Sequence, residues 1–123
     1  MKLLVCGSRS IENDHWVFNK IDDYIFELEF KHNDVIIIEG AARGVDLSAK
    51  RWAQAHDLEI LEYPAEWDKY GRSAGYIRND IMVRECDYCL ILWDGESRGT
   101  KHDIDLCKKY NKNYSVVLRK KIG

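Results

Sequence analysis

Residues 35–46 read VIIIEGAARGVD, an aliphatic run that passes through a glycine-containing loop into a helical pattern. Val35 to Ile38 are apolar without interruption, which is typical of a strand covered on both faces of its sheet. Val45, Ala49, Trp52 and Ala53 then recur at helical spacing. The stretch therefore predicts a strand, a tight turn and a crossover helix, the repeating unit of a parallel sheet.

The same alternation continues along the chain. Further apolar runs lie at residues 3–6, 58–63, 88–93 and 114–118, and helical spacing recurs in three places, at Val17, Ile21, Ile25 and Leu28, at Ile77 and Ile81, and at Ile104 and Cys107. Residues 1–123 are thus predicted to form one α/β domain, a Rossmann-like three-layer sandwich with about five parallel strands. Two glutamates in residues 58–63 suit an edge strand, and right-handed crossovers then favour the order 3-2-1-4-5.

Composition narrows the class of protein. The 123 residues carry a net charge of −2, with 46% hydrophobic and 33% charged residues, which is usual for one globular domain. The apolar start is too short for a signal peptide or a membrane span, so we expect a cytoplasmic protein without a membrane partner. Without a positive field, nucleic acid is not expected as a main partner. The four cysteines lie mostly in apolar stretches, and the histidines lack metal-binding spacing, so disulfides, metals and cofactors are not expected.

Three loops follow the first, second and fourth predicted strands, and ligands of such sheets bind at this edge, near the point where the winding reverses. They read GSRS (7–10), GAARGVD (40–46) and DGESRGT (94–100). Glycine lets backbone N–H groups approach a ligand, a helix N-terminus favours an anion, and arginine suits phosphate oxygens. The alternative is that the glycines only turn the chain. Asp46 either accepts hydrogen bonds from ribose hydroxyls or stabilises the helix dipole.

The connection of residues 64–75 is long for so small a domain, and long loops are usually functional. Trp67 and Tyr70 within it are expected either to stack on a base or to cover the core. Arg78 is predicted in the first turn of the next helix, where a cation opposes the dipole and needs an anionic partner, unless it is solvated at the surface.

Five stretches of the chain together resemble the YspA-related branch of the SLOG superfamily: residues 5–9, 40–46, 64–67, 74–79 and 93–100. The resemblance implies a Rossmann-like fold, a nucleotide-derived ligand and a homodimer. More distant members are the LOG phosphoribohydrolases and the single-strand-binding protein DprA. Arg78 and Asp103 match the catalytic arginine and glutamate of the LOG pattern, although aspartate is one methylene shorter and the Pro-Gly-Gly opening is replaced by residues 94–96.

The predicted function is binding of a phosphate- and ribose-containing, nucleotide-derived ligand, as a sensor or binding module. One alternative is a LOG-like N-glycoside hydrolase acting on nucleoside monophosphates, with Arg78 orienting the phosphosugar and Asp103, expected in the first turn of the last helix, acting on the ribose or on water. The other is single-stranded DNA binding as in DprA. The predicted ligand-binding residues are Gly7, Ser8, Arg9, Gly40, Arg43, Gly44, Asp46, Trp67, Arg78, Asn79, Gly95, Ser97, Arg98, Gly99 and Thr100.

Overall fold

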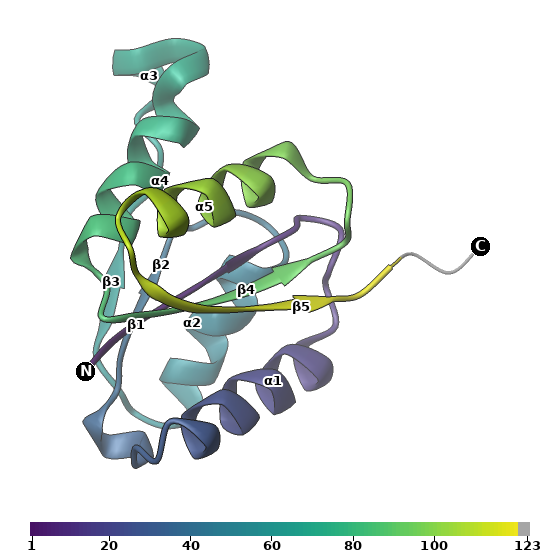
Figure 1. Cartoon of the computed structure of the whole chain (residues 1–123), viewed down its shortest axis with the longest axis vertical. Helices are drawn as coiled ribbons and strands as arrows, with labels where there is room; N and C mark the ends of the chain where they lie inside the picture. Colours follow the sequence, from purple (N-terminus) through teal and green to yellow (C-terminus); the bar gives the residue numbers. More distant parts are fainter. Residues whose placement is uncertain (121–123) are drawn as a thin grey trace.

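The computed structural model describes residues 1–120, which form a five-stranded parallel sheet between two layers of helices (Figure 1). The strand order is β3-β2-β1-β4-β5, so the predicted fold and order are confirmed. The strands are β1 (Lys2–Gly7), β2 (Ile36–Glu39), β3 (Ile60–Glu62), β4 (Tyr88–Trp93) and β5 (Asn113–Leu118). The helices are α1 (Asp14–Glu27), α2 (Val45–Ala55), α3 (Trp67–Tyr70), α4 (Ala74–Glu85) and α5 (Arg98–Lys109), with single 3-10 turns η1 (His32–Asp34) and η2 (Gly71–Ser73).

Alternation along β1 divides the core into two layers. Leu3 and Val5 pack into the cluster beneath α1 and α2, whereas Leu4 and Cys6 belong to the cluster beneath α4 and α5. Figure 1 shows these helix pairs on opposite faces of the sheet, with α3 projecting beyond one end of it. Because successive side chains of a strand point to opposite faces, the uninterrupted apolar runs supply both layers at once.

The segment predicted as a long loop is largely helical. After Pro64, α3 and η2 follow one another and η2 runs directly into α4, so the connection is a broken helix whose joint is Gly71, at φ +58°. Since α4 already begins at Ala74, Arg78 lies in its second turn, and the prediction of a first-turn position was wrong. Asp103 lies likewise in the second turn of α5, because that helix begins at Arg98.

The buried face of α4 also differs from the prediction. Ile81 is 36% exposed, whereas Met82 and Val83 are buried against the sheet. Residues 81–83 are all apolar, so periodicity alone did not distinguish their faces.

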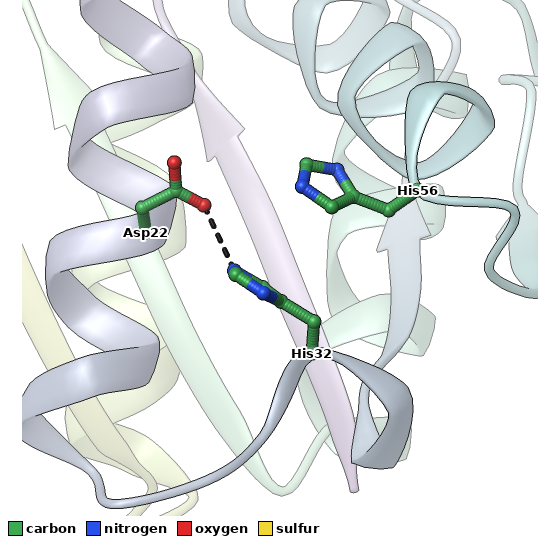
Figure 2. Close-up of side chains that lie close together, drawn as sticks. All are labelled: Asp22, His32 and His56. Carbon is green, nitrogen blue, oxygen red and sulfur yellow. Dashed lines mark hydrogen bonds and ion pairs between the residues drawn. The ribbon is translucent and has the colours of Figure 1, made fainter.

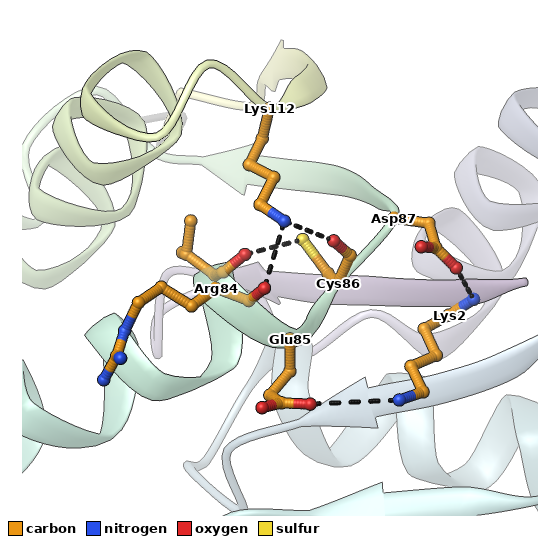
Figure 3. A network of polar contacts seen from close by, with 7 residues as sticks. Lys2, Arg84, Glu85, Cys86, Asp87 and Lys112 are labelled. Atoms are coloured by element: carbon orange, nitrogen blue, oxygen red, sulfur yellow. Dashed lines mark hydrogen bonds and ion pairs between the residues drawn. The ribbon is translucent and has the colours of Figure 1, made fainter.

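Polar contacts tie the C-terminal end of α4 to the amino ends of the strands (Figure 3). The Lys112 amine donates hydrogen bonds to the carbonyl oxygens of Arg84 (3.0 Å) and Cys86 (2.8 Å), which places a cation at the negative end of the helix. The Cys86 thiol is buried and donates to the Val83 carbonyl, and burial raises its pKa to about 12. All four cysteines are buried, as expected for small core residues.

Among residues 1–120, no helix is long and apolar enough to cross a bilayer.

Candidate functional site

A cavity of about 450 Å³ opens at the carboxyl ends of the strands, where β1 and β4 lie side by side. The β1–α1 loop, the starts of α2 and α5, and one side of α3 and α4 form its wall. A second hollow of about 480 Å³ adjoins it and shares Arg9, Arg43, Trp67 and Arg78 with it. This is the edge of the sheet at which the sequence predicts a ligand.

Most of the predicted residues meet at this edge. The cavity is lined by eleven of them, namely Gly7, Arg9, Arg43, Asp46, Trp67, Arg78, Asn79, Ser97, Gly99, Thr100 and Asp103. Gly40 lines the adjoining hollow, and Ser8 is buried behind the wall. Gly44, Gly95 and Arg98 are outside the lining of both hollows, and Arg98 is exposed at the start of α5.

Two carboxyl groups are buried in the cavity wall. Asp46, in the first turn of α2, and Asp103, in α5, are each only 4% exposed. Burial raises the pKa of Asp46 to about 6, against the opposing influence of the Arg78 charge. Burial and the neighbouring Asp46 raise the pKa of Asp103 to about 7. A hydrogen bond with Cys6 opposes this rise, whereas Oδ1 of Asp103 is buried without a hydrogen-bond partner within residues 1–120.

Hydrogen bonds to Gly40 and Asn79 hold the Arg78 side chain in place at the cavity. Its Nη1 donates to the Gly40 carbonyl oxygen, and its Nε donates to Oδ1 of Asn79 at 2.8 Å. A Cβ on Gly40 would lie 2.8 Å from both Nη1 of Arg78 and Oδ2 of Asp46. Glycine at position 40 is therefore required for the guanidinium and the carboxylate to approach the end of β2 together.

A network of short side chains shapes the loop between β4 and α5. Ser10 donates to Asp94 at 2.7 Å, and the other carboxylate oxygen of Asp94 accepts from the backbone N–H groups of Glu96 and Ser97. Partial burial acts to raise the pKa of Asp94, but these hydrogen bonds outweigh it and lower the pKa to about 2. Asp94 is thus a fixed anion that orders the loop, a role the sequence analysis missed because a loop aspartate has no periodic pattern.

The start of α5 is ordered by hydroxyl groups. The Ser97 side chain accepts from the Thr100 backbone N–H at 3.4 Å and from the Thr100 hydroxyl at 3.1 Å, and Ser8 lies 3.4 Å from that hydroxyl. Gly7 has no room for a Cβ, which would collide with the Leu92 carbonyl oxygen. The two glycine loops that flank β1 and β4 therefore pack directly against one another.

Glu39 ends β2 with a fully buried carboxyl group. Burial, followed by a hydrogen bond shared with Glu62 on β3, raises its pKa to about 8. Its Oε1 accepts from the Ala41 N–H at 2.8 Å, which fixes the start of the second glycine loop, where Ala41 has φ +61°. The sequence analysis placed the loop after Glu39 but missed the residue's own role.

Aromatic side chains stand at the outer rim. Trp67 on α3 is 51% exposed and Tyr76 on α4 is 48% exposed, and both line the cavity. Tyr76 also stacks edge-on against His102, with ring centroids 4.6 Å apart. Tyr70, the other expected stacking residue, is outside this lining. Tyr76 was missed because it lies within a helix where aromatic residues are common.

The fold and this edge of the sheet together define a Rossmann-like domain in which three glycine-containing loops meet at one cavity. The chain belongs to the YspA, cpYpsA-related SLOG family, whose family model matches residues 1–70. It is 34% identical over 107 residues to the Gene 61 protein of Mycobacterium phage D29, a match that covers 82% of this chain and 83% of the phage protein.

Two DNA processing proteins share the fold. DprA of Helicobacter pylori superposes with a TM-score of 0.67 at 17% identity, over 98% of this chain and 66% of that protein. DprA of Streptococcus pneumoniae gives 0.68 at 17% identity, over 94% of this chain and 49% of that protein. This chain thus spans about two thirds and about half of their lengths. The Helicobacter pylori protein binds single-stranded DNA.

Proposed function

We propose that the cavity binds a nucleotide-derived small molecule that carries ribose and phosphate, and that the protein acts as a binding module or sensor. One observation carries the proposal. Asp46 and Asp103 are buried in one wall, and Oδ1 of Asp103 has no partner within the described chain. A buried acceptor is costly unless a donor reaches it, and the two hydroxyls of a ribose are donors of the kind that a pair of buried carboxyl groups would accept.

The rest of the cavity fits the other parts of such a ligand. Gly99 and Thr100 lie in the first turn of α5, where helix N–H groups favour an anion, and Arg9 stands exposed at the rim of both hollows. Trp67 and Tyr76 also line the cavity and are half-exposed, and their rings suit stacking on a base. We assign phosphate to the Arg9 and Gly99 side, ribose to the two aspartates and the base to the aromatic rim.

Mass spectrometry of the small molecules released from the purified protein tests the ligand class directly. We expect a compound with ribose and phosphate at a defined stoichiometry. Calorimetry with AMP, GMP and ADP-ribose then compares Arg9→Gln with Arg84→Gln, a control in which the exposed arginine lies on α4 and pairs with Asp80. In Arg9→Gln, loss of a charge-assisted contact should weaken the binding free energy by about 1.5–3 kcal/mol, which raises Kd roughly tenfold to a hundredfold. Arg84→Gln should leave Kd unchanged.

Two results would contradict the proposal. One is equal affinity in wild type, Arg9→Gln and Arg84→Gln. The other is binding of oligothymidylate that the mononucleotides and ADP-ribose do not displace, since that pattern identifies the single-stranded DNA binding described for the Helicobacter pylori relative.

A second candidate, N-glycoside hydrolysis, is favoured by the presence of Arg78 and Asp103 in one cavity wall, with the pKa of Asp103 raised to about 7. A carboxyl group poised near neutrality is suited to proton transfer. Water would add to the anomeric carbon of ribose while the bond to the base breaks, and the base would leave with a proton. Release of free base from a nucleoside monophosphate, abolished in Asp103→Asn at unchanged ligand occupancy, supports the hydrolase over the binder.

A further inference from the structure

Two histidines and an aspartate meet at the end of the sheet opposite the cavity. Figure 2 shows Asp22 from α1, His32 from η1 and His56 from the end of α2 pointing toward one another. One ligand atom from each lies within 4.8 Å of the other two. His32 Nε2 and Asp22 Oδ1 are 3.0 Å apart, close to the separation of about 3.3 Å between two ligands on a tetrahedral zinc ion.

Trp52 orients two of these three groups. Its indole Nε1 donates to Oδ1 of Asp22 at 3.0 Å, and its carbonyl oxygen lies 2.9 Å from Nδ1 of His56. A carbonyl only accepts, so Nδ1 of His56 carries the proton and Nε2 keeps its lone pair for a ligand. Carboxylates and imidazoles that bind metals are commonly fixed by such outer contacts, and Trp52 is fully buried and rigidly placed.

We propose that Asp22, His32 and His56 form a binding site for Zn²⁺, with water as the fourth ligand. Imidazole nitrogen and carboxylate oxygen both suit this ion, and three protein ligands with one water complete the tetrahedral coordination that zinc usually has in proteins. Binding exchanges the His32 Nε2–H···Oδ1 hydrogen bond for two coordination bonds, and the ring proton moves to Nδ1 or to solvent. Both histidines are exposed, so an ion reaches them from solution.

Calorimetric titration of the metal-stripped full chain with ZnCl₂ tests the site. Wild type is expected to bind one ion, with affinity at least tenfold lower in His32→Gln and in His56→Gln. His15→Gln is the matched control, because His15 is an exposed histidine on α1 whose Nε2 contacts Asn19 instead. Circular dichroism of each variant verifies that it is folded.

Substitution with Co²⁺ supplies a second measurement. Four-coordinate cobalt absorbs strongly in the visible range, and that absorption should appear in wild type and His15→Gln but not in the His32→Gln/His56→Gln double variant. Two outcomes overturn the proposal: no bound zinc in wild type, or zinc binding that the double variant retains. Retained binding assigns the ion to other ligands, such as the buried cysteines.

Discussion

At the carboxyl ends of the strands, Asp46 and Asp103 are buried in the wall of one cavity, and Asp103 has an oxygen without a partner within residues 1–120. At the amino ends, polar groups are matched: Asp22 accepts from Trp52 and contacts His32, and Lys112 donates to two helix carbonyls. Polar groups that have hydrogen-bond partners hold the helices and strands together. Buried groups without partners lower stability and are retained where a ligand supplies the partner.

Two of the four tryptophans, Trp52 and Trp67, give the largest expected difference in stability between the ends. Trp52 is fully buried between α1 and α2, so Trp52→Ala should lower the free energy of unfolding by about 3–5 kcal/mol. Trp67 is 51% exposed at the cavity rim, and Trp67→Ala should change stability by no more than about 0.5 kcal/mol. Urea unfolding of both variants measures this, and similar losses would remove the proposed distinction.

The energetic cost of burying the Asp103 carboxyl should appear as a change of folding stability with pH. Its folded pKa is about 7 against an ordinary value of 3.8, so between these values the folded chain keeps a proton that the unfolded chain has lost. Stability from this group is therefore greatest below pH 4 and declines as the pH rises toward 7. Asp103→Asn should raise the free energy of unfolding at pH 8 by roughly 1–3 kcal/mol, with little gain at pH 4.

The control for that experiment lies one half-turn further along α5. Asp105 is exposed and pairs with Lys101, so Asp105→Asn should show no gain at pH 8. Destabilisation of Asp103→Asn at pH 8 would mean that Asp103 has a structural partner and is not held free for a ligand.

Substitution of Lys112 should give the smallest change in folding stability. Lys112→Met keeps the apolar stem but removes the charge at the C-terminal end of α4, at an expected cost of about 0.3–1 kcal/mol. Thermal unfolding measures the loss, and nucleotide affinity should be unchanged because the cavity is at the other end of the strands. A change in affinity would show that the two ends are coupled.

The fold was predictable because continuous apolar runs occur only where both faces of a strand are covered; the fourth run, 88–93, coincides with β4. Asp46, Arg78 and Asp103 were predicted from loop chemistry and family resemblance, and the structure brings them to one wall. The first residue of each helix was less predictable. The start of α4 depends on how α3 and η2 pack before it, and Arg78 therefore lies one turn later in α4 than expected.

Other features depend on contacts between distant residues. Glu39 acquires its raised pKa only when the fold buries its carboxyl group and β3 brings Glu62 beside it. Asp22, His32 and His56 are separated by 10 and 24 positions, so no spacing motif exists, and the sequence analysis accordingly predicted no metal. Such sites arise from packing and become visible only once the fold is known.

The pKa of Asp103, measured by carbon-detected NMR titration of its carboxyl group with and without saturating AMP or ADP-ribose, tests the account most directly. The free protein should titrate near 7, because the carboxyl is buried beside Asp46. Ribose hydroxyls that donate to the carboxylate favour its charged form, so the pKa should fall when the ligand binds. A pKa near 3.8 in the free protein, or one that saturating ligand leaves unchanged, would contradict the proposal that this carboxyl is kept free for a ligand.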